Sequence, residues 1–393
     1  MFLEKIIQRN HKLLECGFDM HSKGLILPDT YVLDLDTIKE NARMILEKAN
    51  EYNIDLYFML KQIGRNPIVA KALIDIGYKG AVVVDYKEAL CMIENGIHIC
   101  NVGHLVQIPD SALNRIIKAR PDYVTVYSYE KIERINEICK KNGLVQKLMI
   151  RLNDDDSDVY SGQIGGFKIN ELQSLIDKVN KLDNVEIKGV TVFPALLFDE
   201  NKKEIVKTDN IKTLERGLSV FKENGITDLN INLPSATCVS SIPLIKQLGG
   251  TSGEPGHGLT GTTPLHKYSD QPEIPAYIYV SEISHNYDGK SYCYGGGHYR
   301  RSHMENVVVG KSVNNMKMSK VVSPSDESID YHYEIVEPFN VGDCVVMAYR
   351  TQIFTTRSTV AVVEGIQSGN YRLLGLFNSL GERINNNWSD NEQ

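Results

Sequence analysis

Residues 55–85 read DLYFMLKQIGRNPIVAKALIDIGYKGAVVVD, and in this stretch two short apolar runs flank a segment of helical periodicity. The runs DLYFMLK (55–61) and GAVVVD (80–85) have the length and composition of strands that are buried on both faces. Between them, PIVAKALIDIGYK repeats its apolar residues at intervals of three and four, and a glycine closes it. A strand, a helix and a second strand in this order favour parallel strands joined by a helical crossover.

The same alternation of strand and helix patterns continues as far as residue 256. Six further runs follow the first two: IHICNVGH (97–104), DYVTVYS (122–128), KLMIRLN (147–153), VEIKGVTVFP (185–194), DLNINLPS (228–235) and QLGGTSGEPG (247–256). About eight such units in roughly 200 residues predict a (β/α)8 barrel. An open doubly wound sheet has the same periodicity and stays open as the alternative at this point.

After about residue 265 the helical periodicity gives way to β-branched and aromatic runs separated by turn residues, which predicts a second, all-β domain. The runs are PAYIYVSEISH, SYCYGGGHY, ENVVVGKS, YHYEIVEPF, GDCVVMAY and STVAVVEG, between residues 275 and 365. An earlier run, TYVLDLD (30–36), is a candidate for a strand that pairs with this domain. We therefore expect four regions: an N-terminal helix and strand over 1–36 packing on the β domain, a barrel over 37–265, the β domain over 266–385, and a polar tail over 386–393.

The composition excludes several classes of protein. The 393 residues include 50 acidic and 43 basic side chains, a net charge of -7, which is opposite to the basic surface that nucleic-acid binding requires. No apolar run reaches the roughly 18 residues of a membrane span. The first 18 residues, MFLEKIIQRNHKLLECGF, mix charges with Ile6, Leu13, Leu14 and Phe18, which predicts a surface helix and not a signal peptide. Seven cysteines without a CxxC pair indicate a reducing compartment, so we expect a cytoplasmic protein with neither nucleic-acid nor membrane partners.

The carboxyl ends of the predicted barrel strands mark the candidate active site, because barrel enzymes build their sites there. Lys61 ends the first strand behind an apolar approach, and a desolvated lysine can attack a carbonyl group as an amine. A lysine whose stem simply carries its charge out to solvent is the structural alternative. Other strand ends place His104, Arg151, Phe193, Asn232 and Ser235 at the same rim. Each of these residues, taken alone, fits a structural role equally well.

The glycine-rich stretch GGTSGEPGHGLTGTTP (249–264) follows the last predicted strand. Exposed backbone N–H groups and small hydroxyls can cradle a phosphate, although an ordinary glycine-rich turn would have the same composition. Glu254 within the stretch would repel a phosphate alone, and it suits a ligand with a cationic group beside its phosphate. An amine nucleophile, a phosphate cradle and an acid directed at a cation together indicate pyridoxal 5'-phosphate (PLP).

The sequence resembles the alanine-racemase-like PLP enzymes of fold type III, through Tyr31–Asp36, Asn41 and YFMLKQIGRNP, and over nearly its whole length it resembles the YhfX family of racemase-like proteins. The stretches that carry the second resemblance are LKQIGRNP (60–67), VDYKEA (84–89), GHLVQIP (103–109), PSAT (234–237), EPGHGLTGT (254–262), SEISH (281–285), SYCYGGGHYRR (291–301) and RTQIF (350–354). The resemblance implies a PLP-binding barrel with a C-terminal β domain, an amino acid of unspecified identity as the small-molecule substrate, and a homodimer with shared active sites.

The resemblance also implies which residues bind the cofactor. Lys61 takes the position of the lysine that carries it, and EPGH is similar to the EPGR segment of fold III decarboxylases, which places Glu254 at the ring nitrogen and His257 where those enzymes have arginine. Arg151 takes the position that reaches the ring oxygen. The residues expected to bind the cofactor are Lys61, Arg151, Ser235, Thr237, Glu254, Gly256, His257 and Gly258.

For catalysis, the resemblance implies amino acid racemisation or epimerisation by two bases, Lys61 and the tyrosine at position 294 of the partner subunit. CYGGGHYRR is similar to the racemase segment that supplies this second base. Arg350 and Cys293 are the candidate substrate-binding residues, and it stays open which of Cys293 and Tyr294 faces the cofactor. The alternatives are a fold III decarboxylase, which would use a cysteine as proton donor, and a PLP-binding protein without turnover.

Three departures from the related enzymes limit these expectations. Alanine racemases place an arginine at the ring nitrogen, where this chain has Glu254. The histidine that racemases stack on the ring corresponds to Val192, which leaves Phe193 as the candidate for stacking. The metal-binding His-x-Cys pair of D-threonine aldolases and D-serine dehydratases corresponds to Arg350 and Gln352, neither of which is a usable ligand, so we expect no metal in the active site.

Overall fold

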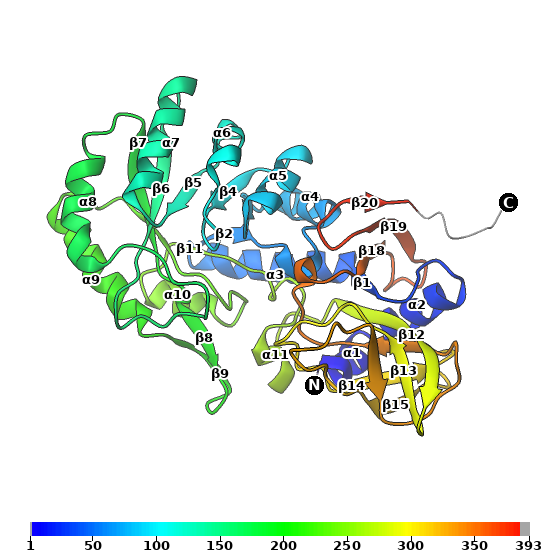
Figure 1. Ribbon diagram of the computed structural model, residues 1–393. Helices are drawn as coiled ribbons and strands as arrows, with labels where there is room; N and C mark the ends of the chain where they lie inside the picture. Colours follow the sequence, from blue (N-terminus) through cyan, green and yellow to red (C-terminus); the bar gives the residue numbers. More distant parts are fainter. Residues whose placement is uncertain (1, 386–393) are drawn as a thin grey trace. The chain divides into compact units, whose positions relative to one another are not determined.

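The computed structural model describes residues 2–385 in two compact units (Figure 1). The barrel unit comprises Met44–Leu60 and Ala70–Gly256, and the β unit comprises Met1–Arg43, Lys61–Val69 and His257–Gln393. The predicted boundaries at residues 36 and 265 stay predictions. The predicted polar tail, residues 386–393, lies outside the described residues.

The barrel unit is a closed ring of eight parallel strands in the order β10-β11-β2-β3-β4-β5-β6-β7. The strands are β2 (Asp55–Phe58), β3 (Gly80–Val82), β4 (Ile99–Val102), β5 (Tyr123–Val126), β6 (Gln146–Arg151), β7 (Val185–Thr191), β10 (Asn230–Asn232) and β11 (Ser252–Gly253). Each strand falls on one of the eight predicted runs. The predicted barrel is therefore confirmed, and the open doubly wound sheet is excluded because the ring closes between β11 and β2.

Helices alternate with these strands, as the sequence pattern predicted. They are α4 (Pro67–Ile76), α5 (Tyr86–Glu94), α6 (Asp110–Lys118), α7 (Tyr129–Asn142), α8 (Leu172–Val179), α9 (Asn210–Glu223) and α10 (Ile242–Gln247). In α7, the Ser128 hydroxyl accepts a hydrogen bond from the backbone N–H of Lys131 at the first turn, and Gly143 ends the helix at φ 64°. Figure 1 shows α5, α6 and α7 side by side along β4–β6.

A small antiparallel pair, β8 (Leu196–Asp199) and β9 (Glu204–Lys207), follows β7 and was not predicted. The strand β9 (EIVK) is charged at both ends and has no buried residue, so it lacks the continuous apolar run that marks the barrel strands, whereas β8 (LLFD) has a short apolar run just after the predicted run 185–194.

The β unit contains a ten-stranded sheet in the order β15-β14-β17-β12-β1-β18-β19-β20, with β13 pairing with β12 and β16. The strands are β1 (Thr30–Asp34), β12 (Tyr277–Tyr287), β13 (Lys290–Tyr294), β14 (Asn306–Gly310), β15 (Lys317–Lys320), β16 (His332–Ile335), β17 (Cys344–Met347), β18 (Thr359–Glu364), β19 (Arg372–Phe377) and β20 (Arg383–Ile384). The first strand, β1, lies antiparallel to β12 and parallel to β18. The C-terminal β domain of the predicted fold class is thus confirmed, while β15, β19 and β20 were not predicted.

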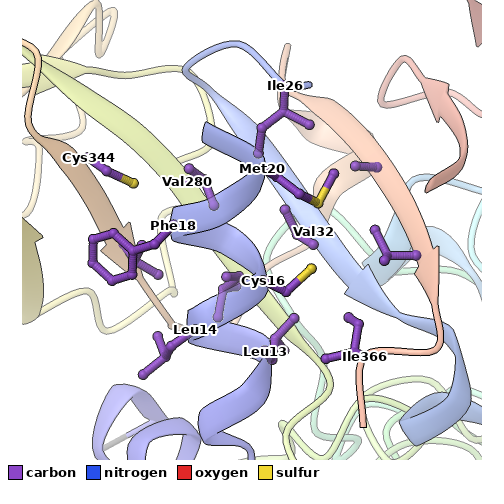
Figure 2. Packing of buried hydrophobic residues seen from close by; sticks show 14 of the residues in the cluster. Leu13, Leu14, Cys16, Phe18, Met20, Ile26, Val32, Val280, Cys344 and Ile366 are labelled. Carbon is purple, nitrogen blue, oxygen red and sulfur yellow. The ribbon is translucent and has the colours of Figure 1, made fainter. Parts of the chain in front are cut away.

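Two N-terminal helices, α1 (Phe2–Arg9) and α2 (His11–Ser22), pack on this sheet, where the sequence predicted a single surface helix. The helical conformation is interrupted at Asn10, between the two helices. The buried side-chain amide of Asn10 donates hydrogen bonds to Asp34 Oδ2 (3.1 Å) and to the Pro275 carbonyl (3.0 Å). Figure 2 shows Leu13, Leu14 and Phe18 of α2 among the apolar side chains of the strands. Burying each such side chain contributes about 1.5–3 kcal/mol.

The remaining helices are α3 (Leu35–Glu51) and α11 (Pro264–Tyr268), with short 3-10 turns at η1 (Lys61–Ile63), η2 (Ile169–Glu171) and η3 (Ile353–Thr355). Within residues 2–385, none of the helices combines the length and the apolar character that a membrane-spanning segment requires.

Candidate active site

Lys61 opens η1, three residues after the end of β2. The segment Lys61–Val69 belongs to the β unit, where η1 packs against η3. Its ammonium lies close enough to His257 to be one of the charges that act on the imidazole. The structure thus brings together two residues that the sequence placed nearly 200 positions apart.

His257 is held between a threonine and an arginine. Its Nδ1 lies 3.2 Å from Thr262 Oγ1, and its Nε2 accepts a hydrogen bond from Arg350 Nε at 3.2 Å. Burial lowers the pKa of His257 well below its usual range, and the positive charges of Arg350 and Lys61 lower it further. The imidazole is therefore neutral at physiological pH, which makes it an acceptor for the guanidinium at Nε2 and not a second cation beside it.

Arg350 is positioned by its own backbone as well as by His257. Its N–H donates to the Ser302 carbonyl at 3.2 Å, which ties it to the loop that follows β13. The neighbouring Tyr349 is fully buried, and its carbonyl accepts a hydrogen bond from Tyr277 Oη at 2.6 Å. A guanidinium presents donors in a planar fork, and this geometry suits a carboxylate.

Arg151, the last residue of β6, is buried at the carboxyl end of the barrel strands. Its Nη1 donates to Tyr127 Oη and to the His104 carbonyl (3.2 Å), and its Nη2 donates to the Gln163 carbonyl (2.8 Å). Its guanidinium also lies over the rings of Tyr127 and Phe193, at 4.9 and 5.7 Å. The buried Nε has no hydrogen-bond partner within residues 2–385, so it is the donor that a bound group could use.

Glu254 follows β11 and is buried in the same unit. Its backbone N–H donates to Thr237 Oγ1 at 3.0 Å, and its Oε2 lies 3.7 Å from Nε2 of the fully buried His104. The His104 ring in turn contacts Phe193 edge-on at 5.2 Å. Glu254, His104, Phe193 and Arg151 thus form one cluster, in which Phe193, and not Val192, supplies the aromatic surface.

The turn after β10 has an unusual backbone, because Ser235 and Ala236 adopt φ 86° and 54°. Two successive non-glycine residues in the left-handed region cost about 1–3 kcal/mol each and are typical of ligand-binding turns. The hydroxyl of Ser235 donates to the Leu196 carbonyl. Asn232, the last residue of β10, bonds to Ser252 Oγ (3.1 Å) and to Thr191 Oγ1 (3.2 Å), which is a structural role within the barrel.

Cys293 and Tyr294 end β13 and face opposite ways. Cys293 is fully buried within the β unit, and burial raises the pKa of its thiol to about 12. Tyr294 is 41% exposed, with its ring 5.9 Å from the ring of His332. A substrate has no access to the Cys293 thiol in this packing, which argues against its predicted substrate-binding role, whereas the phenol of Tyr294 is available to another chain.

Sequence reasoning missed Tyr127, which follows β5 directly and holds Arg151. The rule that selects strand ends could have found it, because Tyr127 is the second-last residue of the run DYVTVYS (122–128). Burial raises the pKa of Tyr127, and the positive charge of Arg151 opposes the rise, so the phenol stays a neutral partner of the guanidinium.

The predicted cofactor residues therefore form two sets. Lys61, His257 and Gly258 belong to the β unit, and Arg151, Ser235, Thr237, Glu254 and Gly256 belong to the barrel unit. The donor set within each unit fits PLP: an amine beside a neutral imidazole in the first, and a buried carboxylate, an orphaned guanidinium N–H and a left-handed turn in the second.

Comparisons with known proteins agree with this architecture. Residues 33–264 match the alanine racemase N-terminal domain family, and residues 278–373 match the YhfX-like C-terminal domain family. The uncharacterized protein YhfX of Escherichia coli (strain K12) is 39% identical over 385 residues, which cover 98% of this chain and 100% of that protein. The alanine racemase of Clostridium tetani (strain Massachusetts / E88) is 28% identical over 196 residues, 48% of this chain and 49% of that protein.

Solved structures of three different enzymes share the fold. D-threonine aldolase from Filomicrobium marinum superimposes with a TM-score of 0.68 at 14% identity, covering 90% of this chain and 94% of that one. Alanine racemase of Clostridium difficile 630 in complex with cycloserine superimposes with a TM-score of 0.63 at 20% identity, covering 90% of this chain and 99% of that one. Diaminopimelate decarboxylase from M. jannaschii in complex with L-lysine superimposes with a TM-score of 0.65 at 14% identity, covering 91% of this chain and 90% of that one. These likenesses concern the fold alone, whereas the match along nearly the whole sequence shows that the chain belongs to the YhfX-like family, whose barrel is an alanine racemase N-terminal domain.

Proposed function

We propose that this chain is a PLP-dependent amino acid racemase or epimerase that acts as a homodimer. The observation that carries the proposal is the grouping of Lys61, His257 and Arg350 in the β unit: a neutral imidazole accepts a hydrogen bond from the guanidinium and lies within the electrostatic reach of the lysine amine. This arrangement offers one group for proton transfer and one for a carboxylate, which are the two groups that α-amino acid chemistry requires.

The residues that would hold the cofactor each have a distinct role. Lys61 would bind it covalently, Glu254 would meet the ring nitrogen, and Arg151 would donate from Nε to the ring oxygen. Its phosphate would be bound by the turn of Ser235 and Thr237 and by the glycines that flank His257. PLP supplies an electron sink that makes the Cα proton of a bound amino acid acidic.

The protein's own groups then move that proton. Nζ of Lys61 removes and returns it on one face, and Oη of the partner subunit's Tyr294 does so on the opposite face, so that the configuration at Cα inverts. Arg350 binds the substrate carboxylate through its two Nη groups, while His257 fixes the plane of the guanidinium through Nε. The exposure of Tyr294 in the single chain supports a role across a dimer interface.

A decarboxylase of the same fold would need a proton donor in place of Tyr294. The adjacent cysteine is the candidate, and its full burial makes it a poor one. Racemisation is therefore the chemistry that these residues support best. A PLP-binding protein without turnover would need neither Arg350 nor an exposed Tyr294.

The test begins with the cofactor. Borohydride reduction of the PLP-loaded protein, followed by peptide mass spectrometry, should find the reduced adduct on Lys61. The loaded protein is then incubated with single D- and L-amino acids in deuterated water. Deuterium at Cα together with inversion supports the proposal, CO2 release overturns it in favour of decarboxylation, and binding without exchange or CO2 release overturns it in favour of a carrier.

The second base is tested by Tyr294→Phe, with Tyr287→Phe as the matched control, because Tyr287 is a more exposed tyrosine (72%) at the end of the adjacent strand β12. Tyr294→Phe should slow racemisation at least about 100-fold, the usual contribution of a general acid–base group, while Tyr287→Phe should not. Equal rates for both variants would refute the role of Tyr294.

A further inference from the structure

A second cluster of reactive side chains lies at the opposite rim of the barrel unit, at the amino ends of β4 and β5. His98 precedes β4, Cys100 lies within it, and Asp122 precedes β5. The active-site candidates lie at the carboxyl ends, where Arg151 is the last residue of β6 and Glu254 follows β11, so this cluster has no part in the proposed reaction. The backbone N–H of Asp122 donates to the Ile99 carbonyl at 3.1 Å, which fixes the two strand ends side by side.

The strand geometry explains why these three side chains converge. His98 and Cys100 are two positions apart along an extended segment, so both project to the same side. In the parallel register, Asn101 is opposite Tyr123, which places Asp122 next to Cys100. The imidazole Nε2 of His98 lies 2.9 Å from Asp122 Oδ1, and the three possible ligand atoms all lie within 4.8 Å of one another.

We propose that His98, Cys100 and Asp122 bind a Zn²⁺ ion at this rim of the barrel. A thiolate, an imidazole and a carboxylate are the three ligand types that zinc takes in proteins, and hard cations such as Mg²⁺ or Ca²⁺ would not select the sulfur. The thiolate and the carboxylate together carry two negative charges, which balance the charge of the ion. A water molecule would complete a tetrahedral site with three protein ligands.

The required rearrangement is small. Zinc–ligand bonds of about 2.0–2.3 Å place the ligand atoms roughly 3.3–3.7 Å apart in a tetrahedron. The present separations need to change by about 1 Å, and the side chains of His98 and Asp122 are partly exposed, at 44% and 41%, whereas the thiol is buried. The thiol packs against Gly80, where a Cβ would lie 2.9 Å from Cys100 Sγ, so only glycine fits at this position. The nearest lysine, Lys79, forms an ion pair with Asp55 at 2.6 Å, so its charge is already balanced.

The experiment uses the full chain after removal of metals by a chelator. Titration with Co²⁺, a spectroscopic substitute for zinc, should saturate at one ion per chain with intense tetrahedral d–d bands and a thiolate-to-cobalt charge-transfer band. Zn²⁺ should then displace the cobalt. Weak octahedral bands, or the absence of the charge-transfer band, would overturn the proposal.

Two variants test whether Cys100 and His98 are the ligands of the bound ion. Cys100→Ser should abolish the charge-transfer band, and His98→Gln should lower the affinity for Zn²⁺ at least tenfold. The second variant changes a half-exposed side chain, so the test survives if the buried cysteine proves necessary for folding. His21→Gln is the matched control, since His21 forms an equally short pair with Glu282 (2.9 Å) in the β unit. Binding that survives His98→Gln unchanged, or that falls equally in His21→Gln, would show that the ion binds elsewhere.

Discussion

Asp29 provides a sharp test of how the β unit is stabilised. Its carboxylate packs against Gly296, in the glycine-rich segment that follows Tyr294. Its Oδ1 accepts hydrogen bonds from Tyr279 Oη (3.0 Å) and from the Ser358 hydroxyl. A Cβ on Gly296 would lie only 2.0 Å from Oδ2. Burial raises the pKa of Asp29 from 3.8 to about 7, although the two hydrogen bonds act in the opposite direction. We predict that Asp29→Asn stabilises the protein at alkaline pH.

The size of the effect follows from the pKa. Between about pH 4 and pH 7 the folded state keeps a proton on Asp29 that the unfolded state has lost, so the free energy of unfolding falls as the pH rises through this window. A shift of about three pH units corresponds to about 4 kcal/mol as an upper limit, since each unit is worth about 1.36 kcal/mol. Asparagine has the same shape and no charge, so it avoids this loss. It also tolerates the left-handed backbone at this position (φ 64°).

The assay is urea unfolding of the parent and of Asp29→Asn, followed by far-ultraviolet circular dichroism at several pH values between 4.5 and 8.5. The other titrating groups are common to both proteins and cancel in the difference. Hydrogen–deuterium exchange of β12 and β18 assigns the change to this part of the β unit. Asp288→Asn is the matched control, because Asp288 has a similar backbone (φ 49°) but is exposed.

The expected result is a difference that is smallest at pH 4.5, grows in favour of Asp29→Asn until about pH 7 and then levels off. Asp288→Asn, which changes an exposed side chain, should leave the free energy of unfolding within about 0.5 kcal/mol of the parent's value. A constant difference for Asp29→Asn across the whole range would refute the buried, protonated carboxyl, and a loss of stability at pH 8 would show that the charge is compensated.

Three further predictions concern packing and the site. Leu14→Ala should lower the free energy of unfolding by about 2–5 kcal/mol in urea titrations, because the side chain is fully buried, whereas Leu27→Ala at a position 45% exposed should cost far less. Arg151→Lys keeps the charge but loses the forked donors that bond to a hydroxyl and two carbonyls; it should cost about 2 kcal/mol or more by the same measurement. His257→Ala should raise KM for the amino acid at least about tenfold with a smaller change in kcat, and His257→Gln should recover much of it because its amide oxygen can accept from Arg350 Nε. Since the imidazole is neutral, the parent's KM should show no titration of this group between pH 6 and 9, and such a titration would contradict the predicted hydrogen bond.

The barrel could be predicted because its strands are buried on both faces and its helices on one. These requirements leave apolar runs and helical periodicity in the sequence, as at 55–85. Elements with weaker burial left no such pattern. The strands β15 (KMSK) and β9 (EIVK) are rich in charged residues and largely exposed or partly buried, and they form because a neighbouring strand supplies their hydrogen bonds.

The sequence by itself determined the order of strands and helices, the family, and the strand ends at which Lys61, Arg151 and Glu254 occur, because these depend on local periodicity and on motifs read along the chain. Only the tertiary structure decided which side chains meet. The bonds from Arg350 to His257 and from Arg151 to Tyr127 join residues that are distant in sequence. The alternation of strand residues shows that Cys293 and Tyr294 face opposite ways, but the direction of each depends on which face of β13 is covered by the rest of the fold.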